Sequence, residues 1–406
     1  PRVDLAVEFC GLQFEHPFML SSAPPTATGE MIRRAFEMGW AGAVTKTLSM
    51  QPTANVRPRF AKLTFEDKRM VGFENIELVT DRPLEYWLPE IERTKKEYPD
   101  KILIASLMAT MNASDWQTLA RKVQEAGADA IELNVSCPHG MPERGMGAAI
   151  GQNPEYTARV TKWVKEVANV PVIVKLTPNV TDLPTIAKAA EKAGADALSG
   201  INTVFGFMGV DLETLEPKPS VDGRGAFGGC CGPMVKPIAL RCVAQMAQST
   251  KLPISGIGGI TTWQDAAEFM MVGATTLQLC TAVMFNGYRI VKDLKVGLAN
   301  YLARKGFSSV KDIIGLILPK LGPVENLDFT HRVVAKINEE RCIRCGACYR
   351  SCRDAGYQAI ELDEQGLPRV DEDKCDGCSL CFQVCPVWGC ITMEKREKLP
   401  EPRVYQ

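Results

Sequence analysis

The sequence has almost no net charge, no long apolar run and no secretion-signal pattern, and each shortage excludes a class of function. Its 406 residues carry a formal net charge of −1, which gives no general attraction to nucleic acids or acidic membranes. No apolar stretch reaches the length of a membrane span. The first residues, PRVDLAVEFCG, lack the basic and apolar regions of a signal peptide. Since 46% of the residues are apolar, we expect a cytoplasmic globular protein of one large domain with an attachment, or of two or three smaller domains.

Cysteine, by contrast, is abundant. The chain has 15 cysteines, and eight of them fall within residues 342–385. Secreted proteins held together by disulfides are usually small, with cysteines distributed along the whole chain. Here the number of cysteines is odd and more than half of them lie in one segment. The pattern therefore indicates metal binding near one end of a cytosolic protein.

Residues 17–306 alternate between short apolar stretches rich in β-branched residues and amphipathic stretches typical of helices. Eight such β/α units over about 290 residues predict an α/β fold of the (β/α)8 TIM-barrel class. The alternative, an open doubly wound sheet, usually has fewer strands and a G-x-G-x-x-G after the first one, and no such motif follows the first strand here. The expected strands are residues 17–23, 41–49, 102–109, 128–136, 170–178, 196–204, 252–260 and 275–283.

The other segments complete the expected domain plan. The barrel is expected over residues 1–318, with residues 7–14 as a hairpin that caps its N-terminal end. Residues 319–336 have no clear period and are interpreted as a linker. A cysteine-rich module is expected over 337–394, followed by a charged tail over 395–406.

The module contains two runs with C-x2-C-x2-C-x3-C spacing. Four thiolates at this spacing hold a [4Fe–4S] cube, and the fourth cysteine of each run ligates the other cluster. Two zinc knuckles are the alternative, although zinc sites rarely use this spacing. The first run has Arg353 where proline is usual, and Cys390 lies outside both runs and is interpreted as a packing residue. We therefore expect a bacterial-ferredoxin-like domain with one cluster on Cys342, Cys345, Cys348 and Cys385, and a second on Cys352, Cys375, Cys378 and Cys381.

Two clusters side by side transfer electrons, so the barrel must supply the chemistry. Active sites of TIM barrels lie where the strands end. A lysine in an apolar strand is costly unless it is paired, so two lysines at strand ends, with asparagines at two others, indicate a polar ligand across the mouth. The residues at these ends are Lys46, Asn134, Lys175, Asn202, Thr203, Gly258, Gly259, Cys280 and Thr281.

The loops after the seventh and eighth strands form the usual phosphate site of such barrels. Gly258 and Gly259 would let backbone N–H groups approach a phosphate there, and Gly232 is a further candidate. A phosphorylated cofactor that links single-electron clusters to hydride transfer is a flavin, which predicts FMN.

Cys137 begins the glycine-rich loop CPHGMPERGMGAAIG. A disulfide, a metal site shared with His139, a buried structural cysteine and a proton donor are the possible interpretations. A free thiol has a pKa near 8.5, so at neutral pH it can protonate one carbon of a polarised C=C bond while the neighbouring carbon receives hydride. The position between a strand and a flexible loop favours the proton donor. His139 is either solvated or orients the substrate or the thiol.

Several motifs carry a family resemblance: VTKT, ENIEL, ELNVSCPHGMPERGMG, VKLTPNVTD, KPIALR and the paired cysteine runs. Through them, essentially the whole chain resembles the dihydropyrimidine dehydrogenases, in the form of the FMN and iron–sulfur subunit found as a separate chain in bacteria. The resemblance implies reversible reduction of uracil or thymine to the 5,6-dihydro compound. Hydride would pass from FMN N5 to C6, and Cys137 would protonate C5.

The same resemblance implies roles for the other residues at the barrel mouth. The pyrimidine would be bound by Asn75, Asn134, Asn202 and Thr203. FMN would be held by Ser22, Lys46, Thr47, Lys175, Gly232, Gly258, Gly259, Cys280 and Thr281. A partner reductase subunit would carry FAD and NAD(P)H, and this chain would form a homodimer within a heterotetramer. Cys230 and Cys231 depart from the family pattern, in which smaller or hydroxyl residues are expected.

Two rival functions remain open at this level. A dihydroorotate dehydrogenase shares the barrel, FMN and a cysteine in a similar loop, but it would need a basic or additional amide group where this chain has His139. A non-catalytic electron-transfer subunit would need neither FMN nor Cys137. The fused cluster runs favour the dihydropyrimidine enzyme.

Overall fold

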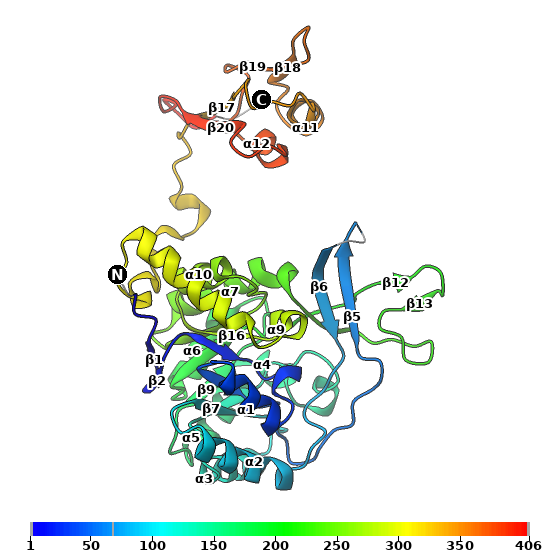
Figure 1. The fold of residues 1–406 in the computed structure, drawn as a ribbon, viewed down its shortest axis with the longest axis vertical. Helices are drawn as coiled ribbons and strands as arrows, with labels where there is room; N and C mark the ends of the chain where they lie inside the picture. The colour runs from blue at the N-terminus through cyan, green and yellow to red at the C-terminus, as the bar shows by residue number, and fades with distance from the viewer. Residues whose placement is uncertain (1–2, 67–68, 404–406) are drawn as a thin grey trace. The chain divides into compact units, whose positions relative to one another are not determined.

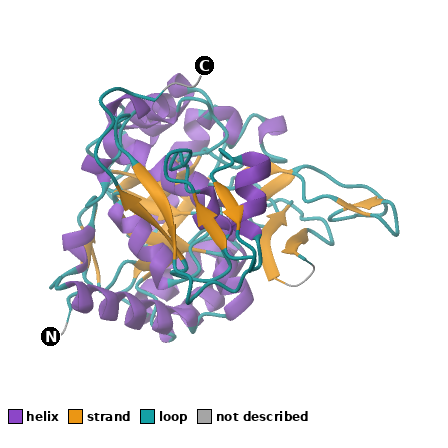
Figure 2. Cartoon of the chain, turned by 90° about the horizontal axis from the view of Figure 1, so that it is seen from above, coloured by secondary structure: helices purple, strands orange, loops and turns teal. Residues whose placement is uncertain are grey.

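The chain forms two compact units that divide between Lys320 and Leu321. Our structure, a computed structural model, describes residues 3–66 and 69–403. The first unit is a closed barrel of eight strands surrounded by helices (Figures 1 and 2). The second unit contains small two-stranded sheets and two α-helices. Within the described residues, no helix combines the length and the apolar character needed to cross a membrane.

The barrel confirms the predicted fold class, because each of its strands overlaps one of the eight expected segments, and only β16 begins outside its segment, by one residue. Every neighbouring pair is parallel, and the order β10-β15-β16-β3-β4-β7-β8-β9 closes on itself. These strands are nearly all buried on both faces, which explains their continuous apolar runs. They are β3 (Phe18–Leu20), β4 (Gly42–Val44), β7 (Ile102–Leu107), β8 (Ala130–Asn134), β9 (Val172–Lys175), β10 (Ala197–Gly200), β15 (Ile254–Ile257) and β16 (Ala274–Leu279).

Helices connect the strands and cover the outside of the barrel. Local sequence fixes their starts: Asn153, for example, accepts hydrogen bonds from the Glu155 and Tyr156 amides, and Pro154 occupies the first helical position. The helices of the unit are α1 (Gly29–Glu37), α2 (Leu84–Glu97), α3 (Ala113–Glu125), α4 (Ala148–Gly151), α5 (Pro154–Lys165), α6 (Leu183–Lys192), α7 (Lys236–Ser249), α8 (Trp263–Met271), α9 (Thr281–Asn286) and α10 (Ile290–Lys305).

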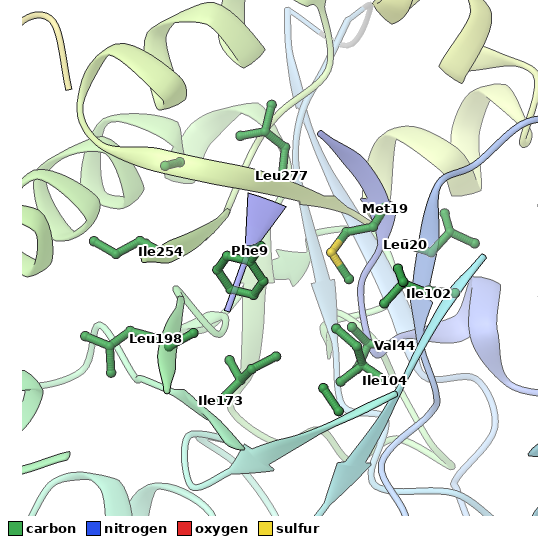
Figure 3. Close-up of a cluster of buried hydrophobic side chains, with 14 of the residues drawn as sticks. Phe9, Met19, Leu20, Val44, Ile102, Ile104, Ile173, Leu198, Ile254 and Leu277 are labelled. Atoms are coloured by element: carbon green, nitrogen blue, oxygen red, sulfur yellow. The ribbon is translucent and has the colours of Figure 1, made fainter. Parts of the chain in front are cut away.

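An N-terminal hairpin closes one end of the barrel, as expected from residues 7–14. Its strands β1 (Val7–Phe9) and β2 (Leu12–Phe14) pair antiparallel. Figure 3 shows the Phe9 ring surrounded by barrel side chains, including those of Leu198 and Ile254 at the beginnings of their strands. Phe9 is fully buried, so it fills the N-terminal end of the barrel and leaves the C-terminal end for a site.

A second sheet, which the sequence did not predict, is built from segments that follow barrel strands. It is antiparallel, in the order β11-β14-β6-β5, and joins residues far apart in the chain. A small hairpin extends beyond it (Figure 1). The strands are β5 (Phe60–Phe65), β6 (Arg69–Asn75), β11 (Val204–Gly206), β14 (Gly228–Cys231) and, in the hairpin, β12 (Val210–Asp211) and β13 (Glu216–Pro217).

The second unit has its own small core around the cysteine runs. Its main sheet pairs β17 (Val333–Ile337) with β20 (Ile391–Lys395), so the expected boundary between residues 336 and 337 falls inside β17. The expected linker therefore supplies a strand, which is too short for its alternation of buried and exposed residues to stand out in the sequence. The remaining elements are α11 (Ala347–Ala355), β18 (Ile360–Leu362), β19 (Pro368–Val370) and α12 (Leu380–Val384).

Candidate active site

A cavity of about 1080 Å³, counted out to its open mouth, lies at the C-terminal end of the barrel. Its walls come from the strand ends, from the segments that follow them and from the second sheet. Every barrel residue that the sequence singled out as a site candidate lines this one cavity. They are Ser22, Lys46, Thr47, Asn75, Asn134, Cys137, Lys175, Asn202, Thr203, Gly232, Gly258, Gly259, Cys280 and Thr281.

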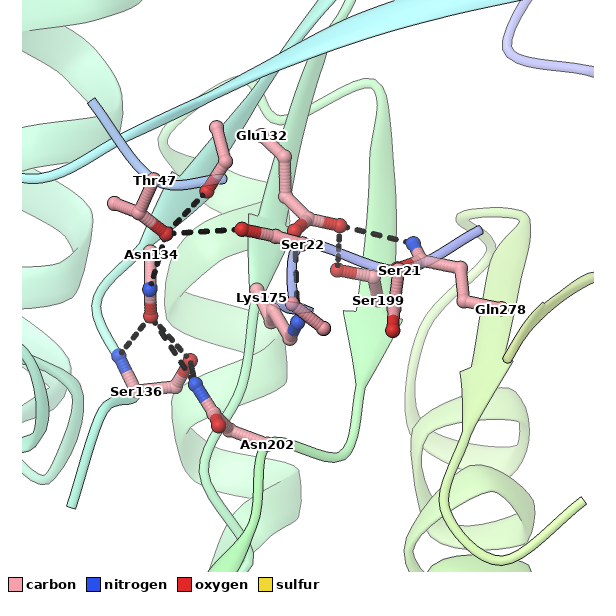
Figure 4. A network of polar contacts seen from close by, with 12 residues as sticks. Ser21, Ser22, Thr47, Glu132, Asn134, Ser136, Lys175, Ser199, Asn202 and Gln278 are labelled. Carbon is pink, nitrogen blue, oxygen red and sulfur yellow. Dashed lines mark hydrogen bonds and ion pairs between the residues drawn. The ribbon is translucent and has the colours of Figure 1, made fainter. Parts of the chain in front are cut away.

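Side-chain amides and hydroxyls form a connected group on one wall (Figure 4). Asn134, the last residue of β8, donates from Nδ2 to Thr47 Oγ1 at 2.9 Å. Its Oδ1 accepts hydrogen bonds from the Ser136 hydroxyl and from Asn202 Nδ2, at 3.0 and 3.2 Å. Asn202 Oδ1 in turn accepts from the Thr203 backbone N–H at 2.8 Å. Because each amide both donates and accepts, the group can exchange these partners for the alternating C=O and N–H groups of a planar ring.

Asn75 reaches the same cavity from the second sheet, at the end of β6. Its Nδ2 donates to the Gly229 carbonyl on β14 at 3.3 Å, and its Oδ1 accepts from the Glu77 backbone N–H at 3.3 Å. Both contacts fix the amide with respect to the backbone. The second sheet is therefore what brings this residue opposite the barrel strand ends.

Lys46 is balanced by Glu77, a residue that sequence reasoning left without a role. Lys46 Nζ lies 2.5 Å from Glu77 Oε2, and Arg59 Nε lies 2.9 Å from Glu77 Oε1. Both Lys46 and Glu77 are buried and line the cavity. The cost of burying an unpaired lysine indicated that a partner such as a carboxylate had to lie nearby. The identity of that carboxylate could not be predicted, because it depends on a contact between residues far apart in the sequence.

Lys175 lies beside a second buried carboxylate, that of Glu132 (Figure 4). Lys175 Nζ lies 3.7 Å from Glu132 Oε1, and the two side chains are only 5% and 0% exposed. Glu132 Oε2 accepts from Ser199 Oγ and from Gln278 Nε2, both at 2.9 Å. Gln278 Oε1 lies in the cavity wall and has no hydrogen-bond partner among the described residues. These residues hold the ammonium group of Lys175 at the cavity floor.

The Cys137 thiol lies at the cavity and donates a hydrogen bond to the His139 carbonyl at 3.5 Å. Burial raises its pKa above the usual range of a thiol, although the positive charges of Lys46 and Lys175 oppose the shift. The thiol is therefore protonated at neutral pH. The loop that follows is packed against the barrel: Met141 is fully buried, and the Cys137 carbonyl accepts from the Ala148 N–H at 3.0 Å.

His139 is not a solvated loop residue, because it is only 5% exposed and lines the cavity. Burial lowers its pKa, so the ring is neutral at pH 7. Its Nε2 lies 3.1 Å from the Glu77 carbonyl, which requires the proton on that nitrogen. Within the part of the chain that the structure describes, Nδ1 is a buried acceptor without a partner.

The far end of the cavity has the close backbone approach that a phosphate site needs. Gly258 and Gly259 follow β15 with φ of +129° and +80°. A Cβ on Gly259 would lie 2.8 Å from the Gly232 carbonyl, so a side chain there would close the space. Together with two lysines and the unpartnered Gln278 oxygen, these features fit a phosphorylated, polar cofactor such as FMN.

The adjacent cysteines that depart from the family pattern have clear structural contacts. Cys231 donates to the Phe73 carbonyl at 3.3 Å and accepts from Thr281 Oγ1 at 3.1 Å. Cys230 is buried in β14, and burial raises its pKa to about 11. Burial likewise raises the pKa of the Cys280 thiol to about 12. These three groups are therefore neutral side chains in the cavity wall.

In the second unit, the eight cysteines of the two runs separate into two sets. Each set lines its own cavity, of about 330 and 360 Å³. Within the described ranges, no three His, Cys, Asp or Glu side chains are grouped closely enough for a single metal ion. A cube of four irons and four sulfides needs more room than one ion, and each set surrounds such a space. The first set is Cys342, Cys345, Cys348 and Cys385, and the second is Cys352, Cys375, Cys378 and Cys381.

Comparison with known families agrees with this geometry. Residues 4–302 match the family model described as dihydroorotate dehydrogenase, and residues 335–393 match the model described as 4Fe-4S dicluster domain. The second match begins within β17, in agreement with the structure rather than with the expected boundary.

Curated relatives match most of the chain. The NAD-dependent dihydropyrimidine dehydrogenase subunit PreA of Escherichia coli K12 is 45% identical over 365 residues, 89% of this chain and 88% of the relative. The catalytic subunit of dihydroorotate dehydrogenase B (NAD(+)) from Pyrococcus abyssi is 41% identical over 315 residues, 77% of this chain and 99% of the relative.

Among solved structures, the dihydroorotate dehydrogenase of Eimeria tenella in complex with ferulenol superposes with a TM-score of 0.64 at 22% identity. The match covers 77% of this chain and 88% of that one, and it supports the barrel fold alone. The chain therefore belongs to the dihydroorotate dehydrogenase family, as a dihydropyrimidine dehydrogenase-like oxidoreductase with FMN in the barrel and two [4Fe–4S] clusters in the C-terminal domain.

Proposed function

We propose that the chain catalyses the reversible reduction of uracil or thymine to the 5,6-dihydropyrimidine. The observation that carries this proposal is a half-buried, protonated thiol, that of Cys137, in the same cavity as four groups able to hydrogen-bond a pyrimidine edge. An acid held next to a bound ring is what protonation of a carbon requires, because carbon accepts a proton slowly without a positioned donor.

Substrate binding is assigned to Asn75, Asn134, Asn202 and Thr203. The uracil edge alternates carbonyl and N–H groups, and the amides present both complementary groups within one cavity. Asn134 is hydrogen-bonded to Asn202 and to Thr47, and Asn75 to the backbone of Gly229 and Glu77, so the amides are held in place before the ring arrives, which lowers the entropic cost of binding.

The chemistry that FMN supplies when bound is hydride transfer, from N5 to C6 of the pyrimidine. Lys46 and Lys175 bring two ammonium groups to the cavity wall, where they favour a cofactor that gains negative charge on reduction. Glu77 and Glu132 keep these two cations fixed. The cofactor is assigned to Ser22, Lys46, Thr47, Lys175, Gly232, Gly258, Gly259, Cys280 and Thr281.

Cys137 Sγ delivers the proton to C5 in the direction of reduction. The thiolate left behind lies within the fields of Lys46 and Lys175, which stabilise the negative charge until a proton returns. In the reverse direction the same sulfur removes the proton from C5.

The two cysteine sets of the second unit are assigned as cluster ligands, with the fourth cysteine of each run serving the other cluster. The clusters carry single electrons. A separate reductase subunit with FAD and NAD(P)H is proposed as their source, in accord with a relative named an NAD-dependent dehydrogenase subunit. A homodimer of this chain within a heterotetramer is proposed as the assembly.

Uracil rather than orotate is the favoured substrate. Orotate carries an additional carboxylate, which needs a free cation or amide. Both lysines that line the cavity are already paired with buried carboxylates, and His139 is neutral and offers only an acceptor nitrogen. The charges of both lysines are therefore already balanced, and the neutral His139 ring offers an additional carboxylate no donor.

Turnover of the two substrates by the full chain tests the proposal. The protein is purified without oxygen, its FMN and iron are measured, and reduced methyl viologen is supplied as electron donor. We expect reduction of uracil and thymine, with orotate reduced at least 100-fold more slowly. A chain that contains FMN and about eight irons but reduces orotate faster than uracil would contradict the proposal.

A further inference from the structure

A fifth cysteine lies at one of the two cluster cavities. Cys390 is outside both ligand runs, yet it lines the cavity formed by Cys342, Cys345, Cys348 and Cys385. It is only 3% exposed, so its thiol faces the interior of the unit rather than solvent. Packing, its expected role, explains the burial but not the choice of a thiol.

The position of Cys390 is fixed by the backbone on both sides. Its N–H donates to the Val387 carbonyl at 3.2 Å, and its carbonyl accepts from the Asn338 N–H at 2.7 Å. β20 begins at the next residue. The side chain lines the same cavity as the side chains of Cys342 and Cys385, and Sγ donates a long hydrogen bond, of 3.7 Å, to the Asn338 carbonyl. The thiol is thus held beside two ligands of one cluster.

The other half of the unit has the same arrangement without the thiol. Ala359 immediately precedes Ile360, the first residue of β18, just as Cys390 immediately precedes Ile391, the first residue of β20. Ala359 lines the cavity of the second cysteine set and is equally buried. The two clusters therefore have matched surroundings that differ at this position by one S–H group.

We infer that the Cys390 thiol turns its one proton from the distant Asn338 carbonyl to the sulfur atoms of the adjacent cluster, and so raises the reduction potential of that cluster above the potential it would have with alanine. Hydrogen bonds to the sulfurs stabilise the more negative, reduced state of a cluster. Ala359 offers no donor, so the second cluster lacks this contribution. The residue thereby sets the relative order in which the two clusters accept electrons, independently of which pyrimidine the barrel reduces.

Two reciprocal substitutions in the full chain test the inference. Cys390→Ala removes the donor, and Ala359→Cys introduces one at the matched position of the other cluster. The readout is an anaerobic redox titration of the two clusters followed by EPR, with iron content measured for each variant. Cys390→Ser keeps a donor at the original position and serves as the conservative control.

We expect Cys390→Ala to shift the reduction equilibrium of one cluster about fivefold toward the oxidised form, which is about 40 mV at 59 mV per tenfold for one electron. The other cluster keeps its potential, and Cys390→Ser stays closer to the unmodified protein. Ala359→Cys raises the potential of the cluster that Cys390→Ala leaves unchanged.

Unaltered potentials in Cys390→Ala, or equal shifts of both clusters, would overturn the inference. If Cys390→Ala fails to retain about eight irons, the inference is tested by the two reduction potentials of the Ala359→Cys variant alone. A rise in one potential supports the role of the thiol, and an unchanged pair of potentials refutes it.

Discussion

Replacing Glu132 with glutamine is expected to destabilise the barrel, because the change leaves Lys175 as a buried cation without its counter-charge. The two groups lie 3.7 Å apart and are 0% and 5% exposed. At an effective dielectric constant of about 20, their attraction is about 4 kcal/mol. Removal of one partner from a buried ion pair costs about 3–5 kcal/mol. Glutamine preserves the shape and the contacts with Ser199 and Gln278, so we expect the free energy of unfolding to fall by about 3–5 kcal/mol.

Urea unfolding of the FMN-free chain, followed by fluorescence of the buried tryptophans of the barrel, measures this change. FMN is removed because a ligand that binds only the native state would mask the loss. Lys175→Met should cost a similar amount, since it leaves the carboxylate unpaired. The double variant E132Q/K175M should be more stable than either single variant, because no charge remains buried. A loss below about 1 kcal/mol for E132Q, or a double variant as unstable as the sum of both singles, would refute this reasoning.

Three further outcomes are expected. Phe9→Ala should lower the free energy of unfolding by about 3–5 kcal/mol in the same urea assay, whereas the exposed Phe65→Ala should change it little. Gly151→Ala would place a Cβ 1.8 Å from the Val135 carbonyl, so it should displace the Cys137 loop and reduce turnover. Gly145→Ala meets no atom within 4 Å and bears only the strain of its left-handed φ of +71°, so it should retain more of the turnover. The pH profile follows from the raised pKa of Cys137: reduction needs the protonated thiol, so its rate should stay constant through neutral pH and past about 8.5, the pKa of a free thiol, while the reverse oxidation, which needs the thiolate, should accelerate with rising pH. A reduction rate that falls with an apparent pKa near 7 would contradict this assignment.

The barrel and the position of the site could be predicted because local signals determine them. Each barrel strand is a short apolar run bounded by an amphipathic segment, and parallel strands place their carboxyl ends at one rim. Residues as distant in sequence as Ser22 and Thr281 could therefore be assigned to a single cavity. The two sets of cysteines could likewise be predicted from the sequence, because cluster ligation fixes the spacing of the thiols along the chain.

Contacts that depend on long-range pairing could not be predicted. The second sheet is one case: β14 reads GGCC, has no alternation of polar and apolar residues, and acquires its register only against β6 and β11. The partners of the two lysines are another. The sequence shows that buried lysines need carboxylates, and Glu132 lies in an apolar strand, but which acid meets which lysine depends on packing across the barrel.

The most direct test of the central claim is the rate of uracil reduction by Cys137→Ala, measured in the full chain with FMN and iron content matched to the unmodified protein. Loss of a positioned general acid lowers a rate by about 10²–10⁴-fold. We expect a decrease in this range with uracil binding retained, because Asn75, Asn134 and Asn202 are unaltered. Near-normal turnover in Cys137→Ala would contradict the assignment of the thiol as the proton donor.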